Sequence, residues 1–532
     1  MLKLNNSKPT VGVAKAALAG TVVVMAATLL SRVMGLVRDI IIFQRFGTTG
    51  DINAYIAAFR IPDALYLLII GGALGSALIP VFSRFLSQNE PAQAWRLANA
   101  IINFSLLALL TAAAFTFVFA PWIVEWLIAP EFSPALKAET VNLTRLLLIQ
   151  PIFLGLGGIA MALLNGTQHF TMPALAPVIY NLSLIAGALL LEPFFHIYSL
   201  VIGVLVGAVL YLVVQLPVLI RLGLRYRPGL DKAAPGLGEV LKVLGPRLLG
   251  QSAFQANFIA MTNLASAQSE NVSVFQVAYN LLMLPFGIFA LSTATVAFPA
   301  MARFYGANDL IGLKRTFSNA VRQVCFFCVP AAVGLILLRR PIVRTLYEGG
   351  NFNARSVDLV SWPLLFFGLA LVSYGLVEIS TRAFYAMHNT RTPVVIAIAT
   401  IGLNIGLGVV LVGPYGVGGL ALGLASSTTV EMLLLLLWLR PKLGGLLEPE
   451  AVLVLGKIAL AGFGMGLALL AGLFLLDEPL NSAGKLAVTV STLGLIGLGG
   501  CIYAGLAYFL HIEELRNALN RVVARLSRLR SH

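Results

Sequence analysis

The chain has 532 residues, of which 59% are hydrophobic and only 11% are charged, and its mean hydropathy is +0.91. A soluble domain carries about 25% charged residues, so this composition excludes a soluble enzyme, a disordered chain and a disulfide scaffold. The formal net charge of +14 is more typical of the Lys and Arg excess on the cytoplasmic side of a polytopic membrane protein than of nucleic-acid binding.

Long apolar segments dominate the chain. A membrane-spanning helix needs about 20 apolar residues, and fourteen segments meet this requirement. The predicted spans are residues 16–44, 52–83, 97–120, 141–165, 173–192, 197–221, 243–267, 273–302, 316–338, 358–386, 393–412, 416–439, 452–476 and 485–510. The first apolar run is not a signal peptide, because it continues through Arg32 and Arg38 without a small-residue cleavage site.

The distribution of Lys and Arg predicts the orientation. If the N-terminus is cytoplasmic, 25 of these residues fall on the cytoplasmic side, 8 on the other side, and 3 inside the first two spans. We therefore expect a multi-pass protein of the cytoplasmic membrane with both termini in the cytoplasm. The expected parts are an N-tail (1–15), an N-lobe (16–221), an inter-lobe linker (222–242), a C-lobe (243–440), two added helices (452–510) and a C-tail (511–532).

The C-tail has its own pattern. Apolar residues recur at helical spacing from Leu515 to Leu529, and arginines occupy most positions between them. This is typical of a basic amphipathic helix that lies on an anionic leaflet. A role in binding a partner protein is the alternative.

The two lobes contain an internal repeat. The segment 80–85 (PVFSRF) resembles 299–304 (PAMARF) at an offset of 219, and the pairs Phe132/Phe352 and Pro173/Pro393 follow at 220. Each half holds six predicted spans, so the halves have the same membrane orientation. Parallel repeats of this kind relate by an axis along the membrane normal, with substrate sites near the midplane where they meet. The sequence thus predicts an all-α protein in which two parallel six-helix repeats surround a central cavity, followed by two C-terminal helices.

Charged side chains at membrane depth are costly and normally face a cavity or a partner. The first span carries Arg32, Arg38 and Asp39, with Gly35 between them to let another backbone approach or to allow a bend. The second span adds Arg60. One interpretation is an internal Arg–Asp pair with side chains that extend toward the interface. The other is a cationic lining for an anionic substrate, since Arg matches phosphate geometry.

Other polar groups carry less information. Glu378 and Arg382 lie four residues apart and predict a local salt bridge; a coupling-cation site near Glu378 is the alternative, and Glu431 is a weaker candidate. No catalytic constellation or resident cofactor is predicted, and no Walker A motif occurs. Energy would then come from an ion gradient, the membrane potential or the substrate gradient.

Three motifs resemble those of the lipid II flippase family. They are the first-span segment Ser31–Asp39 (SRVMGLVRD), the second-span segment Asn53–Pro62 (NAYIAAFRIP) and the following stretch Gly72–Pro80 (GALGSALIP). The resemblance covers residues 16–440 as an ordered series, and the span count extends it to about 510.

The resemblance implies a fold of the multidrug/oligosaccharidyl-lipid/polysaccharide exporter superfamily. It also implies movement of lipid II, the undecaprenyl-diphosphate-linked disaccharide-pentapeptide, to the outer leaflet by alternating access. Membrane lipids and cell-wall synthesis proteins are the other partners it implies, with no role for nucleic acid. By the resemblance Arg32 and Arg38 meet the diphosphate, Arg60 matches a further basic position, and Ser31 and Asp39 flank the arginines.

The sequence departs from the family pattern at three positions. Asn53 stands where an acidic residue is common, and Tyr66 and Asn280 stand where cavity arginines are found. These three complete the expected substrate-binding set. The missing arginines keep open a flippase for another lipid-linked oligosaccharide. A multidrug exporter is less favoured, because cationic drugs need acidic cavity residues. A non-transporting scaffold is disfavoured by the short C-tail.

Overall fold

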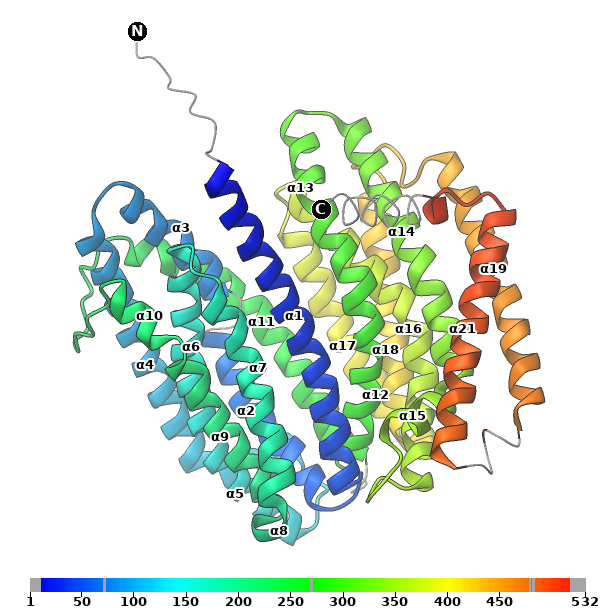
Figure 1. Cartoon of the computed structure of the whole chain (residues 1–532), viewed down its shortest axis with the longest axis horizontal. Coiled ribbons are helices and arrows are strands. Elements are labelled where there is room, and N and C mark those ends of the chain that lie inside the picture. Colours follow the sequence, from blue (N-terminus) through cyan, green and yellow to red (C-terminus); the bar gives the residue numbers. More distant parts are fainter. Residues whose placement is uncertain (1–10, 70–72, 268–270, 478–479, 481–483, 517–532) are drawn as a thin grey trace. The chain divides into compact units, whose positions relative to one another are not determined.

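A computed structural model describes residues 11–69, 73–267, 271–477, 480 and 484–516 of the chain (Figure 1). The chain divides into two compact units, Met1–Asn263 and Leu264–His532, called here the N-terminal unit and the C-terminal unit. Both are built from helices. The predicted C-tail helix beyond residue 516 lies outside the described residues.

The N-terminal unit begins with the long helix α1 and ends in α11. Its elements are α1 (Val11–Phe46), α2 (Asp51–Ile69), α3 (Ala73–Ser87), α4 (Pro91–Trp122), η1 (Ile123–Ile128), α5 (Pro134–Leu147), α6 (Ile149–Gly166), α7 (Thr171–Ala186), η2 (Gly187–Leu191), α8 (Glu192–Phe195), α9 (Tyr198–Val213), α10 (Leu216–Arg221) and α11 (Leu237–Ala265). Between α10 and α11 the chain runs without regular structure over residues 222–236.

The C-terminal unit has a similar helical content. Its elements are α12 (Asn271–Pro285), η3 (Phe286–Ala290), α13 (Leu291–Gly306), α14 (Leu310–Leu337), α15 (Arg339–Tyr347), α16 (Ala354–Ala386), α17 (Arg391–Tyr415), α18 (Val417–Leu439), α19 (Pro449–Leu475) and α21 (Lys485–Phe509). A single turn joins α17 to α18, where Gly416 adopts φ of 56°. A residue without Cβ takes this left-handed conformation at little cost.

Within the described residues, eleven helical segments are long and apolar enough to cross a membrane. They match the predicted spans from 97–120 to 197–221 and from 273–302 to 485–510. The three remaining predicted spans contain α1, the pair α2 and α3, and α11. Large apolar side chains face outward on these helices, among them Phe474, Leu475 and Phe509. A bilayer is the environment in which such a surface is stable.

Small residues bring helices together inside the N-terminal unit. Where α7 and η2 pack against α9, a Cβ on Gly203 would lie 3.0 Å from the Ser183 carbonyl oxygen and 3.1 Å from the Leu184 Cα. A Cβ on Gly187 would lie 2.7 Å from the Ser199 carbonyl oxygen. Backbone atoms cannot rotate away as side chains can, so glycine allows this close approach.

Backbone landmarks recur between the units at the offset found in the sequence. Asn89 and Asn308, 219 residues apart, both adopt positive φ, as do Gln168 and His388, which are 220 apart. Ser133 caps the start of α5 through the Leu136 N–H. Asn353, 220 residues later, caps α16 in the same way through the Ser356 N–H.

A buried arginine ties the start of the C-tail to the C-terminal unit. Arg322 on α14 donates from Nε to Glu514 and from Nη2 to Glu513, the latter at 3.2 Å. The Arg322 and Glu514 side chains are only 10% and 11% exposed, whereas Glu513 is 74% exposed. The tail therefore begins at a buried ion pair. Nearby, Cys325 and Cys328 are buried free thiols.

The division into units differs from the expected lobes at one helix. Residues 243–263 of α11 belong to the N-terminal unit, whereas the sequence assigned 243–440 to one lobe. Within that unit α11 contacts η1, since the Asn263 amide donates to the carbonyls of Trp126 and Leu127. The functional lobe boundary at 222–242 stays a prediction.

Candidate functional site

The first-span charges form a hydrogen-bonded cluster between α1 and α7. Arg38 donates from Nε and Nη2 to Asp39 Oδ1 at 2.9 and 2.7 Å. Its Nη1 donates to Asn181 Oδ1 at 3.0 Å. The Asn181 amide in turn donates to the Ser31 carbonyl oxygen at 3.3 Å. Asn181 thus links two of the predicted residues, Ser31 and Arg38, and Arg38 in turn holds its neighbour Asp39.

This arrangement compensates the charge of Arg38 without enclosing it. The Arg38 and Asp39 side chains remain 26% and 17% exposed. A guanidinium has five N–H donors, and these hydrogen bonds use one donor on each nitrogen, so among the described residues two donors of Arg38 remain available to a ligand. Bidentate recognition of a phosphate needs two such donors.

Arg32 lies on the same helix, and its side chain is exposed. The seven-residue spacing puts it on roughly the same face of α1 as Asp39. The sequence left open a close backbone approach or a bend at Gly35, and a Cβ there would meet no described heavy atom within 4 Å. The open surroundings leave space beside the arginines.

Arg60 belongs to a different cluster in the N-terminal unit. Its Nε donates to Thr262 Oγ1 on α11 at 2.7 Å, and its guanidinium lies 5.6 Å from the centre of the Phe258 ring. Thr262 Oγ1 also donates to the Phe258 carbonyl oxygen at 2.9 Å. Arg60 therefore links α2 to α11, and the sequence pattern gave no signal for this pairing.

Asn53 and Tyr66 on α2 occupy packed positions. Asn53 is fully buried, and its amide donates to the Thr48 carbonyl oxygen at 2.9 Å, which stabilises the chain entering α2. Tyr66 packs against two apolar clusters, one that includes Leu78 and one that includes Tyr211. These contacts give both residues a structural role.

Asn280 lies in the C-terminal unit, on α12. It accepts a 2.7 Å hydrogen bond from Gln276 one turn earlier. A neutral amide at this position offers a ligand hydrogen bonds but no net charge.

The predicted salt bridge on α16 is present. Arg382 donates from Nε to Glu378 Oε1 at 2.9 Å, and its guanidinium lies 5.8 Å from the centre of the Phe298 ring. In the part of the chain that the structure describes, no group of three or more His, Cys, Asp and Glu side chains is placed to hold a metal ion. The coupling cation stays a prediction.

The partner of Arg38 that sequence reasoning missed is Asn181. It is buried on α7, 143 residues from Arg38, and a single Asn in an apolar helix is an ordinary feature. Its only sequence signal is its setting in an otherwise apolar span, where a polar group needs a partner.

Comparison with known proteins extends the resemblance to most of the chain. The model of the family "Lipid II flippase MurJ" matches residues 42–479. The probable lipid II flippase MurJ of Vibrio cholerae is 30% identical over 520 residues, which cover 94% of this chain and 98% of that protein. The lipid II flippase MurJ of Burkholderia cenocepacia is 30% identical over 431 residues, covering 80% and 83%.

Solved structures give the same result. A lipid II flippase MurJ in an inward closed conformation superimposes with a TM-score of 0.78 at 26% identity and covers 92% of this chain and 99% of its own. An inward-facing multidrug transporter of the MATE family gives a TM-score of 0.63 at 18% identity over 80% of this chain and 98% of its own, a likeness of fold alone. This integral membrane protein belongs to the lipid II flippase MurJ family, a family of transporters.

Proposed function

We propose that the protein is a flippase of the bacterial cytoplasmic membrane that moves lipid II from the cytoplasmic to the outer leaflet by alternating access. The observation that carries this proposal is a family match over residues 42–479. The guanidinium of Arg38 supports it, because two of its N–H donors remain available among the described residues. Lipid II carries a diphosphate, and such donors are what a diphosphate requires.

In this proposal Arg38 and Arg32 bind the diphosphate, and Asp39 and Asn181 position Arg38. Asp39 fixes one edge of the guanidinium and Asn181 fixes another, which lowers the entropic cost of presenting the remaining donors. Arg60 acts at a second location through its link to α11.

The proposed architecture has fourteen spans. The eleven apolar segments, with α1, the pair α2 and α3, and α11, account for this number. The recurrence of positive-φ residues and helix caps at offsets of 219 and 220 supports two parallel six-span repeats. The Lys and Arg count of 25 against 8 supports cytoplasmic termini.

The test is complementation of bacterial cells depleted of their own lipid II flippase. We expect the wild-type chain to restore growth and lipid II on the outer leaflet, and Arg32→Ala or Arg38→Ala to abolish both. Arg45→Ala is the matched control, because Arg45 lies at the end of the same helix and is about half exposed. If the Arg32→Ala and Arg38→Ala variants both expose lipid II normally on the outer leaflet, the assignment of these arginines to diphosphate binding is refuted.

A second candidate is a flippase for another lipid-linked oligosaccharide. It is favoured by two neutral residues, Tyr66, which packs against an apolar cluster, and Asn280, which accepts a hydrogen bond from Gln276. They give this chain fewer cationic contacts than the family pattern. Failure of the wild-type chain to complement, together with rescue of cells that lack an O-antigen or capsule flippase, would select this function.

The proposed energy source is a cation gradient or the membrane potential, with Glu378 as the candidate cation ligand. If Glu378 only pairs with Arg382, Glu378→Gln and Arg382→Gln will reduce lipid II exposure to the same small extent. A cation role predicts loss of activity in Glu378→Gln alone. The two variants are matched because each removes one partner of the same 2.9 Å contact.

A further inference from the structure

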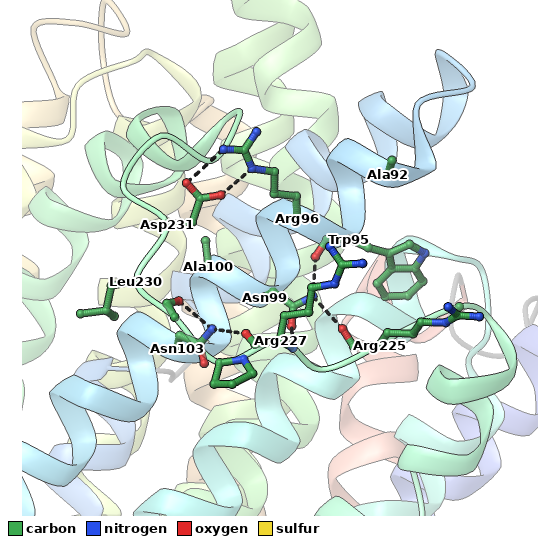
Figure 2. Close-up of a pocket in the computed structure, with 13 residues that line it drawn as sticks. Ala92, Trp95, Arg96, Asn99, Ala100, Asn103, Arg225, Arg227, Leu230 and Asp231 are labelled. Atoms are coloured by element: carbon green, nitrogen blue, oxygen red, sulfur yellow. Dashed lines mark hydrogen bonds and ion pairs between the residues drawn. The ribbon is translucent and has the colours of Figure 1, made fainter.

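A second basic feature lies away from the arginines of α1. The first turns of α4 and the segment 223–231 enclose a pocket of about 620 Å³, lined among others by Trp95, Arg96, Arg225, Arg227 and Asp231 (Figure 2). All of these residues belong to the N-terminal unit. The positive-inside pattern accounts for arginines in this segment, but it does not require them to line a concavity.

Two buried asparagines on α4 fix the shape of this pocket. The Asn99 amide donates to the carbonyl oxygens of Trp95 and Arg225 at 2.9 and 3.1 Å, and Asn99 Oδ1 accepts from the Arg227 N–H at 2.8 Å. The Asn103 amide donates to the carbonyl oxygens of Arg227 and Gly229 at 2.8 and 2.9 Å. The segment is therefore held through its main-chain atoms and the Tyr226 hydroxyl, which donates to Asn103 Oδ1 at 2.9 Å, and the side chains of Arg225 and Arg227 are not needed to hold it.

The charges around the pocket do not cancel. Arg96 forms an ion pair with Asp231, and this hydrogen bond holds the pKa of the Asp231 carboxyl below its usual range. The guanidinium groups of Arg225 and Arg227 are exposed and, among the described residues, form no ion pair or side-chain hydrogen bond. Figure 2 shows both side chains extending from the segment beside Trp95. With Arg96 balanced by Asp231, the lining has two uncompensated positive charges.

The position of the pocket indicates what these charges meet. Arg225 and Arg227 follow the last residue of the apolar segment Tyr198–Arg221 by four and six residues, and Trp95 lies in the first turns of the apolar segment that begins at Pro91. In the proposed membrane arrangement both segment ends lie at a membrane surface, where Trp is enriched. Basic pockets at this level bind the head groups of anionic lipids.

We propose that this pocket binds the phosphate-bearing head group of an anionic membrane lipid. Arg225 and Arg227 supply the charge, and Trp95 lies against the glycerol and upper acyl region. The assignment to the cytoplasmic leaflet rests on the orientation in the proposed function. The shape is built before the lipid arrives, because Asn99 and Asn103 already hold the segment.

The test is native mass spectrometry of the purified full-length protein in detergent, titrated separately with dioleoylphosphatidylglycerol, dioleoylphosphatidylcholine and inorganic pyrophosphate. The pocket variant is Arg225→Ala with Arg227→Ala. The matched control is Arg221→Ala with Lys232→Ala, which removes the same charge from exposed residues of the same region outside the pocket lining. Melting temperatures close to that of the wild-type protein will establish that both variants fold.

We expect the pocket variant to bind phosphatidylglycerol about tenfold more weakly and the control variant to change by less than about twofold. Lys at both pocket positions should restore most of the affinity, because it keeps the charge. If the pocket and control variants lose the same affinity for phosphatidylglycerol, the lipid is attracted by the general positive charge of the region and the proposal is overturned. Unchanged affinity in both variants would overturn it as well. If the pocket variant loses as much affinity for phosphatidylcholine as for phosphatidylglycerol, the pocket does not recognise the negative charge of the head group and the proposal fails.

Pyrophosphate separates a lipid from a soluble ligand. If pyrophosphate binds the wild-type protein, binds the pocket variant more weakly, and phosphatidylglycerol does not bind, the occupant is a soluble phosphate and the lipid assignment fails. Complementation of flippase-depleted cells is scored independently. If the wild-type chain does not complement but still binds phosphatidylglycerol about tenfold more tightly than the pocket variant, the proposed function is refuted and the lipid site remains supported.

Labelling of a Lys232→Cys variant by a membrane-impermeant maleimide in intact cells would overturn only the assignment of the pocket to the cytoplasmic side.

Discussion

The contact between Arg38 and Asn181 gives a quantitative prediction. Asn181→Leu keeps the branching and the number of side-chain heavy atoms but removes two hydrogen bonds, the 3.0 Å bond from Arg38 and the 3.3 Å bond to the Ser31 carbonyl oxygen. A bond to a charged donor contributes about 1.5–3 kcal/mol and a neutral one about 0.5–1 kcal/mol. We therefore expect the free energy of unfolding to fall by about 2–4 kcal/mol.

A double-mutant cycle isolates the charged bond. Arg38→Gln and Asn181→Leu are measured singly and together by reversible unfolding of the purified protein in bicelles. Because the two residues share one bond, the effects should be non-additive by at least about 1 kcal/mol. The control cycle pairs Asn181→Leu with Arg45→Gln, which lies in the last turn of α1, about two turns beyond Arg38, and should be additive. Additivity of the Arg38 cycle within about 0.5 kcal/mol would refute the proposed positioning.

Three further predictions concern other parts of the chain. Glu514→Gln should lower unfolding free energy by about 3–5 kcal/mol, because it removes the buried partner of a buried guanidinium, whereas Glu513→Gln should cost less than about 1 kcal/mol; similar losses in the same bicelle assay would contradict the buried pair. Gly203→Leu should destabilise by at least about 1–3 kcal/mol, because its Cβ would press on backbone atoms, and an unchanged melting temperature would exclude this packing. The lowered pKa of Asp231 means that its ion pair with Arg96 stabilises the segment above pH about 4 and is lost as pH falls through the carboxyl's folded pKa. A spin label in the segment should become more mobile on acidification, an effect that Asp231→Asn should remove.

The spans were predictable because they depend on local composition. A run of about 20 apolar residues has few alternatives to a membrane helix, and breaks such as the one at Gly416 lie where a helix must end. Eleven predicted spans coincide with apolar helices of the described residues. The salt bridge between Glu378 and Arg382 was predictable for the same reason, since both ends lie on one helix.

Contacts between distant segments were not predictable in this way. Helical spacing relates Arg32 to Asp39, but it does not indicate that Arg38 meets Asn181 or that Arg60 meets Thr262 across 202 residues. These pairs depend on which helices pack together. Gly35 shows a second limit, because a glycine in an apolar helix allows either a close approach or a bend, and the sequence does not choose between them; a Cβ there would meet no described heavy atom within 4 Å.

Asn99 and Asn103 have a consequence for how this protein can change over time. Their amides bind main-chain carbonyls of the segment that follows α10, so the conformation of that segment is encoded largely in α4. Substitutions at positions 225 and 227 can therefore alter its charge while the loop keeps its path. The charge of this segment can thus diverge independently of its backbone conformation. Related chains in membranes of different lipid composition can change the charge and keep the conformation.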